Sequence, residues 1–250
     1  QPRVTIGLPV YNGQEYLEET LKAILAQSFE DFELIISDNA STDATEEICR
    51  AYAARDERIA YSRNDKNLGA APNYNGLLDR AKGAYFKWAA ADDLIAPEYL
   101  ARCVEILDHN PEILICHTGV CLIDENGEYL RDYDDQLHFL ASNSAARLRD
   151  YLFRRAGMWN AVFGLIRTDQ LRETQLIGSY PSSDHVLLGE LVLRGKVRRI
   201  PDRLLFRRKH PAQAGGAYGK KGAVAEWFDS RNRGKVLLPR RLRHFLGYLE

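Results

Sequence analysis

The adjacent carboxylates of Asp92 and Asp93 are the side chains of this sequence best suited to hold a metal ion. Two carboxylates about 4 Å apart repel each other by roughly 4 kcal/mol at an effective dielectric constant of 20. A divalent cation turns this repulsion into attraction. Hard oxygen ligands select Mg²⁺ or Mn²⁺, which keep open positions for phosphate oxygens. Alone, however, such a pair is a weak signal, because many adjacent aspartates cap helices or lie in turns.

Two further polar clusters strengthen the signal, because each follows a predicted strand in the same way as Asp92 and Asp93. Pro9-Val10-Tyr11-Asn12 follows the first predicted strand, and the run from Asp38 to Asp43 follows the second. Ligands of open parallel sheets bind outside the carboxyl ends of the strands. We therefore predict one ligand site to which three strand ends contribute.

Neither of the common phosphate-binding loops is present in the sequence. The first strand is followed by Pro9-Val10-Tyr11-Asn12-Gly13 instead of GxGxxG, and no GxxxxGK[ST] run occurs. A nucleotidyltransferase would usually show a glycine-rich, basic loop at this point, so that class is disfavoured. A cation held by carboxylates is the natural alternative for neutralising phosphates.

The elements that must position these clusters alternate regularly over the first hundred residues. Short apolar runs predict strands at residues 4–8, where Pro9 is expected to stop the strand, and at 32–37, 59–62 and 85–89. Apolar residues at spacings of three and four predict helices at 16–25, 42–53 and 71–81. Such alternation predicts a parallel sheet with helices on both faces.

The pattern changes after a helix expected at residues 97–109. Two antiparallel strands, 113–123 and 128–133, flank the turn Asp124-Glu125-Asn126-Gly127. Further elements are predicted as a helix at 145–155, a strand at 161–166, a helix at 183–194 and a strand at 203–208. We therefore predict one α/β domain over residues 1–215, with a mostly parallel nucleotide-binding half at 1–110 and a mixed antiparallel half at 111–215. Residues 216–250 are predicted to be a basic, helical extension.

Composition and charge narrow the class of protein. The chain is 45% hydrophobic and 28% charged, as in soluble globular proteins, and no apolar run reaches the roughly 18 residues of a membrane span. Because Gln1-Pro2-Arg3-Val4 leads directly into the first predicted strand, we expect no secretory leader. The four cysteines lack metal-site spacing, and we expect buried, reduced thiols in a cytoplasmic protein. They are Cys49, Cys103, Cys116 and Cys121.

The basic residues are concentrated near the end of the chain. Between Arg194 and Arg243 there are 16 Lys or Arg against three acids, although the net charge of the whole chain is only −1. The net charge gives no reason to expect a nucleic-acid partner. The basic segment could attract diphosphates, anionic lipid or a lipid-linked acceptor, or form a solvated face. Its apolar residues make bilayer docking a hypothesis; they are Trp227, Phe228, Leu237, Leu238 and Phe245.

The order and spacing of these motifs resemble the family-2 glycosyltransferases, which have the GT-A fold. The resemblance rests on the first strand with Pro9-Val10-Tyr11-Asn12, then the run from Asp38 to Asp43, Asn67-Leu68-Gly69, and the run from Trp88 to Asp93. It implies contacts with a nucleotide-sugar donor. Pro9, Tyr11 and Asn12 would border the nucleobase, Asp38 would hydrogen-bond the base edge, and Asn67 would help to close the base and ribose pocket. Asp92 would reach ribose or the donor sugar, and Asp93 would ligate the metal that bridges the phosphates.

The resemblance also assigns the second half of the chain. Asp184, at the start of a helix, would be the catalytic base that faces the acceptor hydroxyl, where the family usually has Glu-Asp and this chain has Ser183-Asp184. The open alternative is a helix-capping or first-turn acid. His210 would complete the metal site, Arg208 or Lys209 would meet phosphate, and Trp159 would line the acceptor pocket. Many members carry a further acid where this chain has Ala90, so the resemblance implies that one contact to ribose or sugar would be missing.

Together, the motifs predict an inverting glycosyltransferase that uses Mn²⁺ or Mg²⁺. The expected donor is a nucleotide-diphosphate sugar, with uridine the commonest base in the family, and the expected acceptor is a glycan or lipid-linked molecule. We also expect a role in cell-surface polysaccharide biosynthesis and a location in the cytoplasm, at the inner face of the membrane. The alternative is a non-catalytic nucleotide-sugar or carbohydrate-binding module that keeps the fold.

Overall fold

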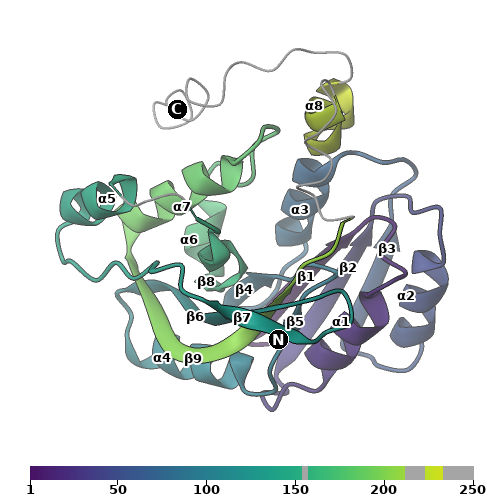
Figure 1. The fold of residues 1–250 in the computed structure, drawn as a ribbon, viewed down its shortest axis with the longest axis horizontal. Coiled ribbons are helices and arrows are strands. Elements are labelled where there is room, and N and C mark those ends of the chain that lie inside the picture. The colour runs from purple at the N-terminus through teal and green to yellow at the C-terminus, as the bar shows by residue number, and fades with distance from the viewer. Residues whose placement is uncertain (154–156, 212–222, 233–250) are drawn as a thin grey trace.

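The computed structural model describes residues 1–153, 157–211 and 223–232. Its first half is the predicted parallel sheet, with strands in the order β3-β2-β1-β4 (Figure 1). Strands and helices alternate along the chain as β1 (Val4–Val10), α1 (Leu17–Leu25), β2 (Phe32–Asp38), α2 (Thr45–Ala53), β3 (Ile59–Arg63), α3 (Ala70–Asp79) and β4 (Tyr85–Trp88).

The first strand does not stop at Pro9, as the sequence predicts, but continues to Val10. Pro9 pairs with Ser37 of β2, whereas β4 pairs with β1 only as far as Gly7. Proline lacks a backbone N–H, and it is tolerated in a strand where no neighbour requires that hydrogen bond. The strand can therefore extend to the edge of the sheet where the candidate site lies.

The second half extends this sheet with strands of both directions. The described elements are β5 (Leu94–Ile95), α4 (Tyr99–His109), β6 (Ile113–Ile123), β7 (Tyr129–Tyr133), α5 (Ser144–Leu152), the 3-10 helix η1 (Asn160–Phe163), β8 (Leu165–Arg167), α6 (Thr168–Arg172), α7 (Ser183–Arg194), β9 (Lys196–Arg208), α8 (Ala223–Phe228) and the 3-10 helix η3 (Ser230–Asn232). The sheet continues from β4 through β8, β6 and β9 to β5, and β7 pairs with β6. This confirms the predicted fold class, a mostly parallel sheet with an antiparallel elaboration.

Two predicted strands differ from the structure. Residues 161–166 were expected to form one strand, but η1 occupies the first part because the carbonyl of Phe163 accepts from Lys87 Nζ and from the Tyr99 hydroxyl at 3.0 Å. The last strand begins at Lys196 instead of residue 203, since it pairs with β6 along most of its length.

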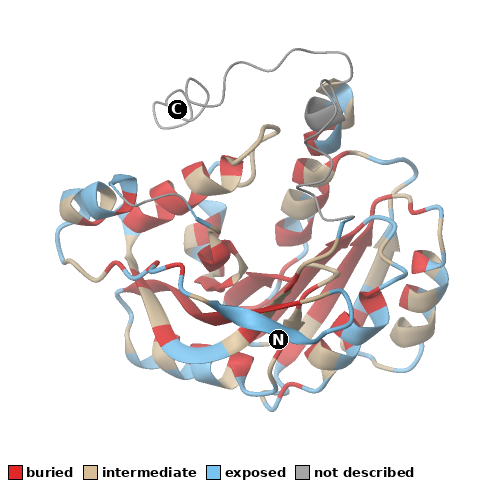
Figure 2. Cartoon of the chain, viewed as in Figure 1, coloured by how far each residue is buried: buried red, intermediate tan, exposed pale blue. Residues whose placement is uncertain are grey.

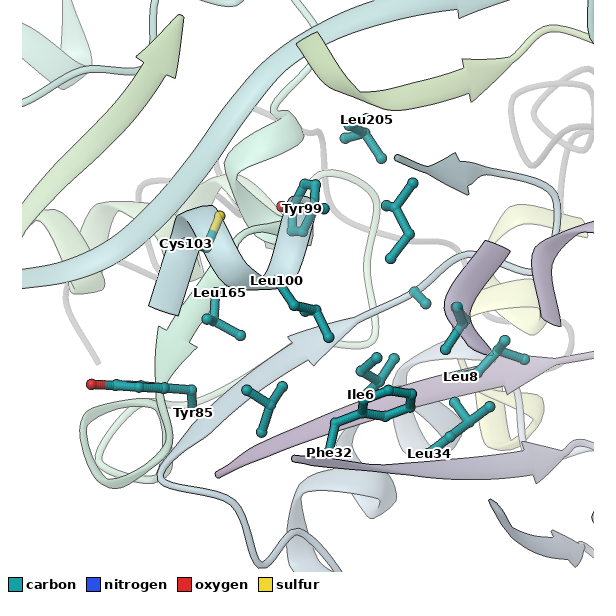
Figure 3. Close-up of a cluster of buried hydrophobic side chains, with 14 of the residues drawn as sticks. Ile6, Leu8, Phe32, Leu34, Tyr85, Tyr99, Leu100, Cys103, Leu165 and Leu205 are labelled. Atoms are coloured by element: carbon teal, nitrogen blue, oxygen red, sulfur yellow. The ribbon is translucent and has the colours of Figure 1, made fainter. Parts of the chain in front are cut away.

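The core lies on both faces of the sheet (Figure 2), and Figure 3 shows one of its two clusters, the one that contains Ile6 and Leu8. Along β1, Ile6 and Leu8 face α1 and α4, whereas the intervening Gly7 faces α3, where a Cβ atom would come within 2.7 Å of the Phe86 ring. Sheets that are covered on both faces have nearly continuous apolar strands. The burial of every residue of β1 is therefore expected, and the polar chemistry is confined to the strand ends.

The remaining general predictions have simple outcomes. All four cysteines are buried, free thiols, as expected. In the described part of the chain, no helix is long and apolar enough to cross a membrane. Of the predicted extension 216–250, only residues 223–232 are described, and they contain α8. Leu237, Leu238 and Phe245 lie outside the described residues.

Candidate functional site

The three predicted polar clusters lie at one edge of the sheet. Val10 pairs with Asp38 at the ends of β1 and β2, and β4 lies on the other side of β1, so the loops after all three strands leave in the same direction. The loop after β4 carries Asp92 and Asp93. The convergence that the sequence predicted is therefore present in the fold.

The loop after β1 is fixed by Asn12. Its backbone is left-handed, with φ of 51°, a conformation that asparagine tolerates better than most residues. Its backbone N–H donates to Ser41 Oγ at 2.9 Å, and its side-chain oxygen accepts from the Thr42 N–H at 2.8 Å. Tyr11, beside it, is 49% exposed. The loop thus presents an exposed aromatic ring at the sheet edge, two residues after Pro9, and this arrangement is compatible with the predicted stacking on a base.

Asp38 is fully buried at the end of β2. Its two oxygens accept from the Ser41 N–H at 2.8 Å and from the Tyr61 hydroxyl at 2.9 Å, and Arg63 Nε lies 3.5 Å away. Burial, followed by the hydrogen bond to Asp38, raises the pKa of Tyr61. In the structure, Asp38 therefore holds its own loop and β3 in place, and its contact with a nucleobase stays a prediction.

Asn67 orders the loop that precedes α3. Its side-chain oxygen accepts from Asn39 Nδ2 at 2.9 Å and from the Gly69 N–H at 2.8 Å. Asn39 in turn accepts from the Leu68 N–H at 2.9 Å. These hydrogen bonds of the two asparagine side chains join the loop after β2 to the loop before α3. One network therefore holds both of the loops that are predicted to line the nucleotide pocket.

Asp92 and His210 form a contact that the sequence did not predict as a pair. His210, two residues after β9, places Nε2 at 3.0 Å from Asp92 Oδ2, and its ring packs against Tyr16 with centroids 4.7 Å apart. Neighbouring ligands of an octahedral ion with bonds of about 2.1 Å also lie about 3 Å apart. The described residues gather no group of three or more His, Cys, Asp or Glu side chains. A carboxylate and an imidazole fit an Mg²⁺ or Mn²⁺ site that takes its remaining ligands from water and substrate phosphate.

Asp93 points into the protein and is only 6% exposed. Oδ1 accepts from the Arg208 N–H at 3.0 Å, and Oδ2 lies 3.1 Å from Arg207 Nε. Burial raises the pKa of the Asp93 carboxyl, and the positive charge of Arg207 opposes that rise. The geometry therefore favours Asp92 over Asp93 as the carboxylate that faces His210.

Arg208 is fully buried, in contrast to the exposed phosphate ligand that the basic run predicts. Its guanidinium donates to the carbonyls of Asp92 at 3.1 Å and Glu125 at 3.0 Å, and to Glu19 Oε2 at 2.5 Å. It also lies over the Tyr16 ring, 4.6 Å from the centroid. Arg208 thus ties α1, the turn between β6 and β7, and the loop of Asp92 together, which makes it a positioning residue.

Replacing Arg208 by lysine is expected to lower the free energy of unfolding by roughly 2–4 kcal/mol, because one ammonium cannot satisfy acceptors on three segments. Urea denaturation measures this loss. The matched control is Arg203→Lys, since Arg203 makes a half-exposed ion pair with Asp132 at 3.0 Å. That substitution is expected to change stability by less than about 1 kcal/mol. Equal losses for the two variants would contradict the positioning role.

Arg207 and Lys209, the basic residues on either side of Arg208, are partly exposed, whereas Arg208 is fully buried. Arg207 Nη1 donates to Asn160 Oδ1 at 3.0 Å, while its Nε faces Asp93. Lys209 Nζ lies 3.4 Å from Met158 Sδ, and its pKa is lowered by burial and by the charge of Arg207. Of the predicted phosphate contacts, Lys209 is thus the one compatible with the geometry, and Arg207 is a residue that the prediction left out.

Asp184 lies in the first turn of α7. Its charge, like those of Asp92 and Asp93, acts on the hydroxyl of Tyr74, which belongs to α3. Its pKa is raised by burial and then by Asp92, with smaller contributions from Asp93 and Asp184, while Arg207 lowers it. The Tyr74 carbonyl accepts from Trp88 Nε1 at 3.0 Å, which fixes α3 against the end of β4. Tyr74 was missed because no motif contains it; its only signal is its place one turn into the helix that follows Asn67-Leu68-Gly69.

Trp159 belongs to an aromatic cluster beside the first turn of α7. Its ring centroid lies 4.3 Å from that of His185 and 4.9 Å from that of Tyr151. His185 directly follows Asp184 in the chain. The predicted acceptor-side tryptophan therefore packs on the residue that follows the predicted base, and its contact with an acceptor stays a prediction.

Comparison with known sequences identifies the relatives of this chain. The model of the family described as glycosyl transferase family 2 matches residues 5–167. An uncharacterized glycosyltransferase of Methanocaldococcus jannaschii is 33% identical over 135 residues, which cover 53% of this chain and 47% of that protein. The abequosyltransferase RfbV of Salmonella typhimurium is 36% identical over 149 residues, which cover 56% of this chain and 44% of that protein. The match thus spans about half the length of each relative.

Solved structures share the fold at lower sequence identity. The S. aureus TarS fragment 1–349 in complex with UDP-GlcNAc superposes with a TM-score of 0.67 at 18% identity, over 83% of this chain and 59% of that one. The mannosyltransferase PcManGT from Pyrobaculum calidifontis, in complex with GDP-Man and Mn²⁺, gives a TM-score of 0.62 at 18% identity, over 87% of this chain and 59% of that one. At such identity the likeness extends to the fold alone.

Proposed function

The chain belongs to glycosyl transferase family 2, and on this premise we propose that it is a metal-assisted, inverting glycosyltransferase. It would move a sugar from a nucleotide diphosphate to an acceptor hydroxyl. The observation that carries the proposal is the contact of Asp92 with His210 at the sheet edge. Asp184 lies near enough to this edge that its charge, like that of Asp92, helps to raise the pKa of Tyr74. A metal-binding pair and a separate carboxylate on the other half of the domain are the two parts that a single displacement needs.

Each step has a residue of this chain to perform it. The carboxylate of Asp184 takes the proton of the acceptor hydroxyl as its oxygen bonds to the anomeric carbon. The bond from that carbon to the diphosphate oxygen breaks, and its electron pair leaves with the diphosphate. When bound by Asp92 and His210, Mn²⁺ or Mg²⁺ would stabilise the charge of that leaving group. Lys209, and Arg207 beyond it, add positive charge on the same side.

The substrate class is also part of the proposal. A UDP-sugar is the favoured donor, and the TarS complex with UDP-GlcNAc supports it. A GDP-sugar is the alternative donor, because PcManGT is in complex with GDP-Man. We propose a glycan or lipid-linked acceptor and a role in cell-surface polysaccharide synthesis on the cytoplasmic side of the membrane, with peripheral membrane contact through the basic segment. Ala90, which replaces a common acid of the family, is the feature that favours the alternative of a non-catalytic binding module.

A screen of nucleotide sugars tests the proposal. At a concentration of about 100 Kd, a bound nucleotide sugar is expected to stabilise the protein by about 2.7 kcal/mol, or to raise Tm by about 5–10 °C. The shift should occur with Mn²⁺ and disappear with EDTA. If none of the nucleotide sugars raises Tm, the proposal is wrong. Stabilisation without release of nucleoside diphosphate, over a panel of glycan and lipid-linked acceptors, would favour the binding module.

A further inference from the structure

Asp229, between α8 and η3, is a buried acid that belongs to none of the motifs. It is 3% exposed, and its carboxylate accepts from Ser179 Oγ at 3.0 Å and from the Arg231 N–H at 2.9 Å. Arg231 Nη2 also donates to it at 2.7 Å. Hydrogen bonds from Arg231 lower the pKa of Asp229 to about 2, so it is ionised at neutral pH and is a strong acceptor. The question is what this carboxylate holds together.

On one side, the segment touches the loop before α3 with its backbone. The N–H of Ser230 donates to the Leu68 carbonyl at 3.1 Å. Gly69 has φ of +90°, and a Cβ atom there would lie 2.5 Å from the Cα of Asp229. Only glycine permits this approach and this conformation. Asn67, whose side chain accepts from the Gly69 N–H, belongs to the same loop, so the segment of residues 229–232 contacts the loop that is predicted to close the nucleotide pocket.

On the other side, Asp229 holds the loop that leads to α7. Ser179 lies three residues before Ser182, whose left-handed backbone, with φ of 63°, starts the helix of Asp184. The same loop is tied to α3 by Asn75, which exchanges two hydrogen bonds with Ile177 at 2.9 and 3.1 Å. In Figure 1 this loop reaches from α7 toward α8, which sits at the end of α3. The bond from Ser179 to Asp229 therefore ties the acceptor half to the segment of residues 229–232, which in turn contacts the loop before α3 in the nucleotide-binding half.

We propose that Asp229 is a positioning residue that sets the loop of Asn67-Leu68-Gly69 against the loop that leads to Asp184, and so shapes the nucleotide pocket. The inference rests on the proposed function. Its geometric basis is the pair of contacts on opposite sides of one short segment: the backbone of Ser230 on Leu68, and the carboxylate of Asp229 on Ser179. Loss of either contact is expected to loosen the nucleotide loop without touching Asp92, His210 or Asp184.

Three variants test the inference with the full chain, by calorimetric titration of UDP and GDP in Mn²⁺. Ser179→Ala removes the hydrogen bond to Asp229, and it is expected to raise the Kd of the bound nucleotide about fivefold. Gly69→Ala displaces the segment from the other side and should raise the Kd at least as much. Ser230→Ala is the matched control, because it makes the same chemical change in the segment but keeps the backbone bond to Leu68. We expect it to bind within twofold of the wild type.

The outcomes separate this inference from the proposed function. If Ser179→Ala and Gly69→Ala lower Tm but bind nucleotide as tightly as the wild type, Asp229 is only structural and the inference is wrong. Equal weakening by all three variants would also overturn it, because Ser230→Ala keeps both contacts. If the wild type itself binds neither UDP nor GDP, the proposed function fails, and the positioning role fails with it.

Discussion

Replacing Asp184 by asparagine is expected to lower the turnover number for sugar transfer by at least about a hundredfold. Asparagine keeps the size of the side chain and can still lie at the start of α7, but it cannot take the proton of the acceptor hydroxyl. The binding of nucleoside diphosphate should not change, because Asp92 and His210, the residues proposed to hold the metal beside the diphosphate, remain. Release of nucleoside diphosphate under saturating donor and acceptor measures turnover, and calorimetry measures binding.

The alternative for Asp184 is an acid that merely stabilises the first turn of its helix. Such an acid contributes about 0.3–1 kcal/mol through the helix dipole. Asp169, exposed in the first turn of α6, provides the control, since Asp169→Asn makes the same chemical change at an equivalent helix position. We expect that variant to keep full turnover. If Asp184→Asn behaves like Asp169→Asn, with a small loss of stability and normal turnover, Asp184 is not the base.

The part of the fold that carries the candidate site could be predicted from the sequence because its signals are local. Apolar runs of strand length and helical spacings recur over residues 4–89, and the polar clusters come directly after the strands. In a parallel sheet, residues that directly follow a strand lie at the edge formed by the carboxyl ends of the strands. The prediction that the clusters after β1, β2 and β4 share one edge was therefore correct, although it used no tertiary contact.

The role of Arg208 could not be predicted in the same way. A cation in the run Arg207-Arg208-Lys209 indicates a solvated or phosphate-binding surface, because unpaired charges are rarely buried. Its burial depends on acceptors at Glu19, Asp92 and Glu125, which are 189, 116 and 83 residues away. No local pattern encodes that coincidence. The contact of Ser179 with Asp229 is hidden for the same reason, since each residue alone is an ordinary turn residue.

The orientation of Asp92 and Asp93 lies between these two cases. Successive side chains on an extended backbone point in opposite directions, so a division of labour between them could be predicted. Which of the two side chains faces outward depends on which one contacts β9. The end of β9 contacts Asp93, whose carboxylate accepts from the Arg208 N–H and pairs with Arg207 Nε. His210, which follows β9, then meets Asp92.

Replacing Asp92 by asparagine is therefore expected to remove the dependence of nucleotide binding on Mn²⁺. In Mn²⁺ the affinity for the nucleoside diphosphate should fall roughly 30- to 100-fold, the equivalent of about 2–3 kcal/mol of lost cation–phosphate attraction. In EDTA the variant and the wild type should bind alike, since nucleobase contacts do not involve Asp92. Calorimetric titration with and without Mn²⁺ gives both numbers.

The matched variant is Asp93→Asn, which changes the neighbouring carboxylate in the same way. The neutral amide removes the ion pair of residue 93 with the Arg207 guanidinium, so we expect a lower Tm. The response to Mn²⁺ should be retained, because Asp92 is unchanged. The opposite pattern, in which Asp93→Asn abolishes the Mn²⁺ response and Asp92→Asn keeps it, would restore the assignment that the sequence alone favours. The comparison is decisive because the two residues share one loop. A general disturbance of the loop would affect both variants, whereas a ligand is lost in only one of them.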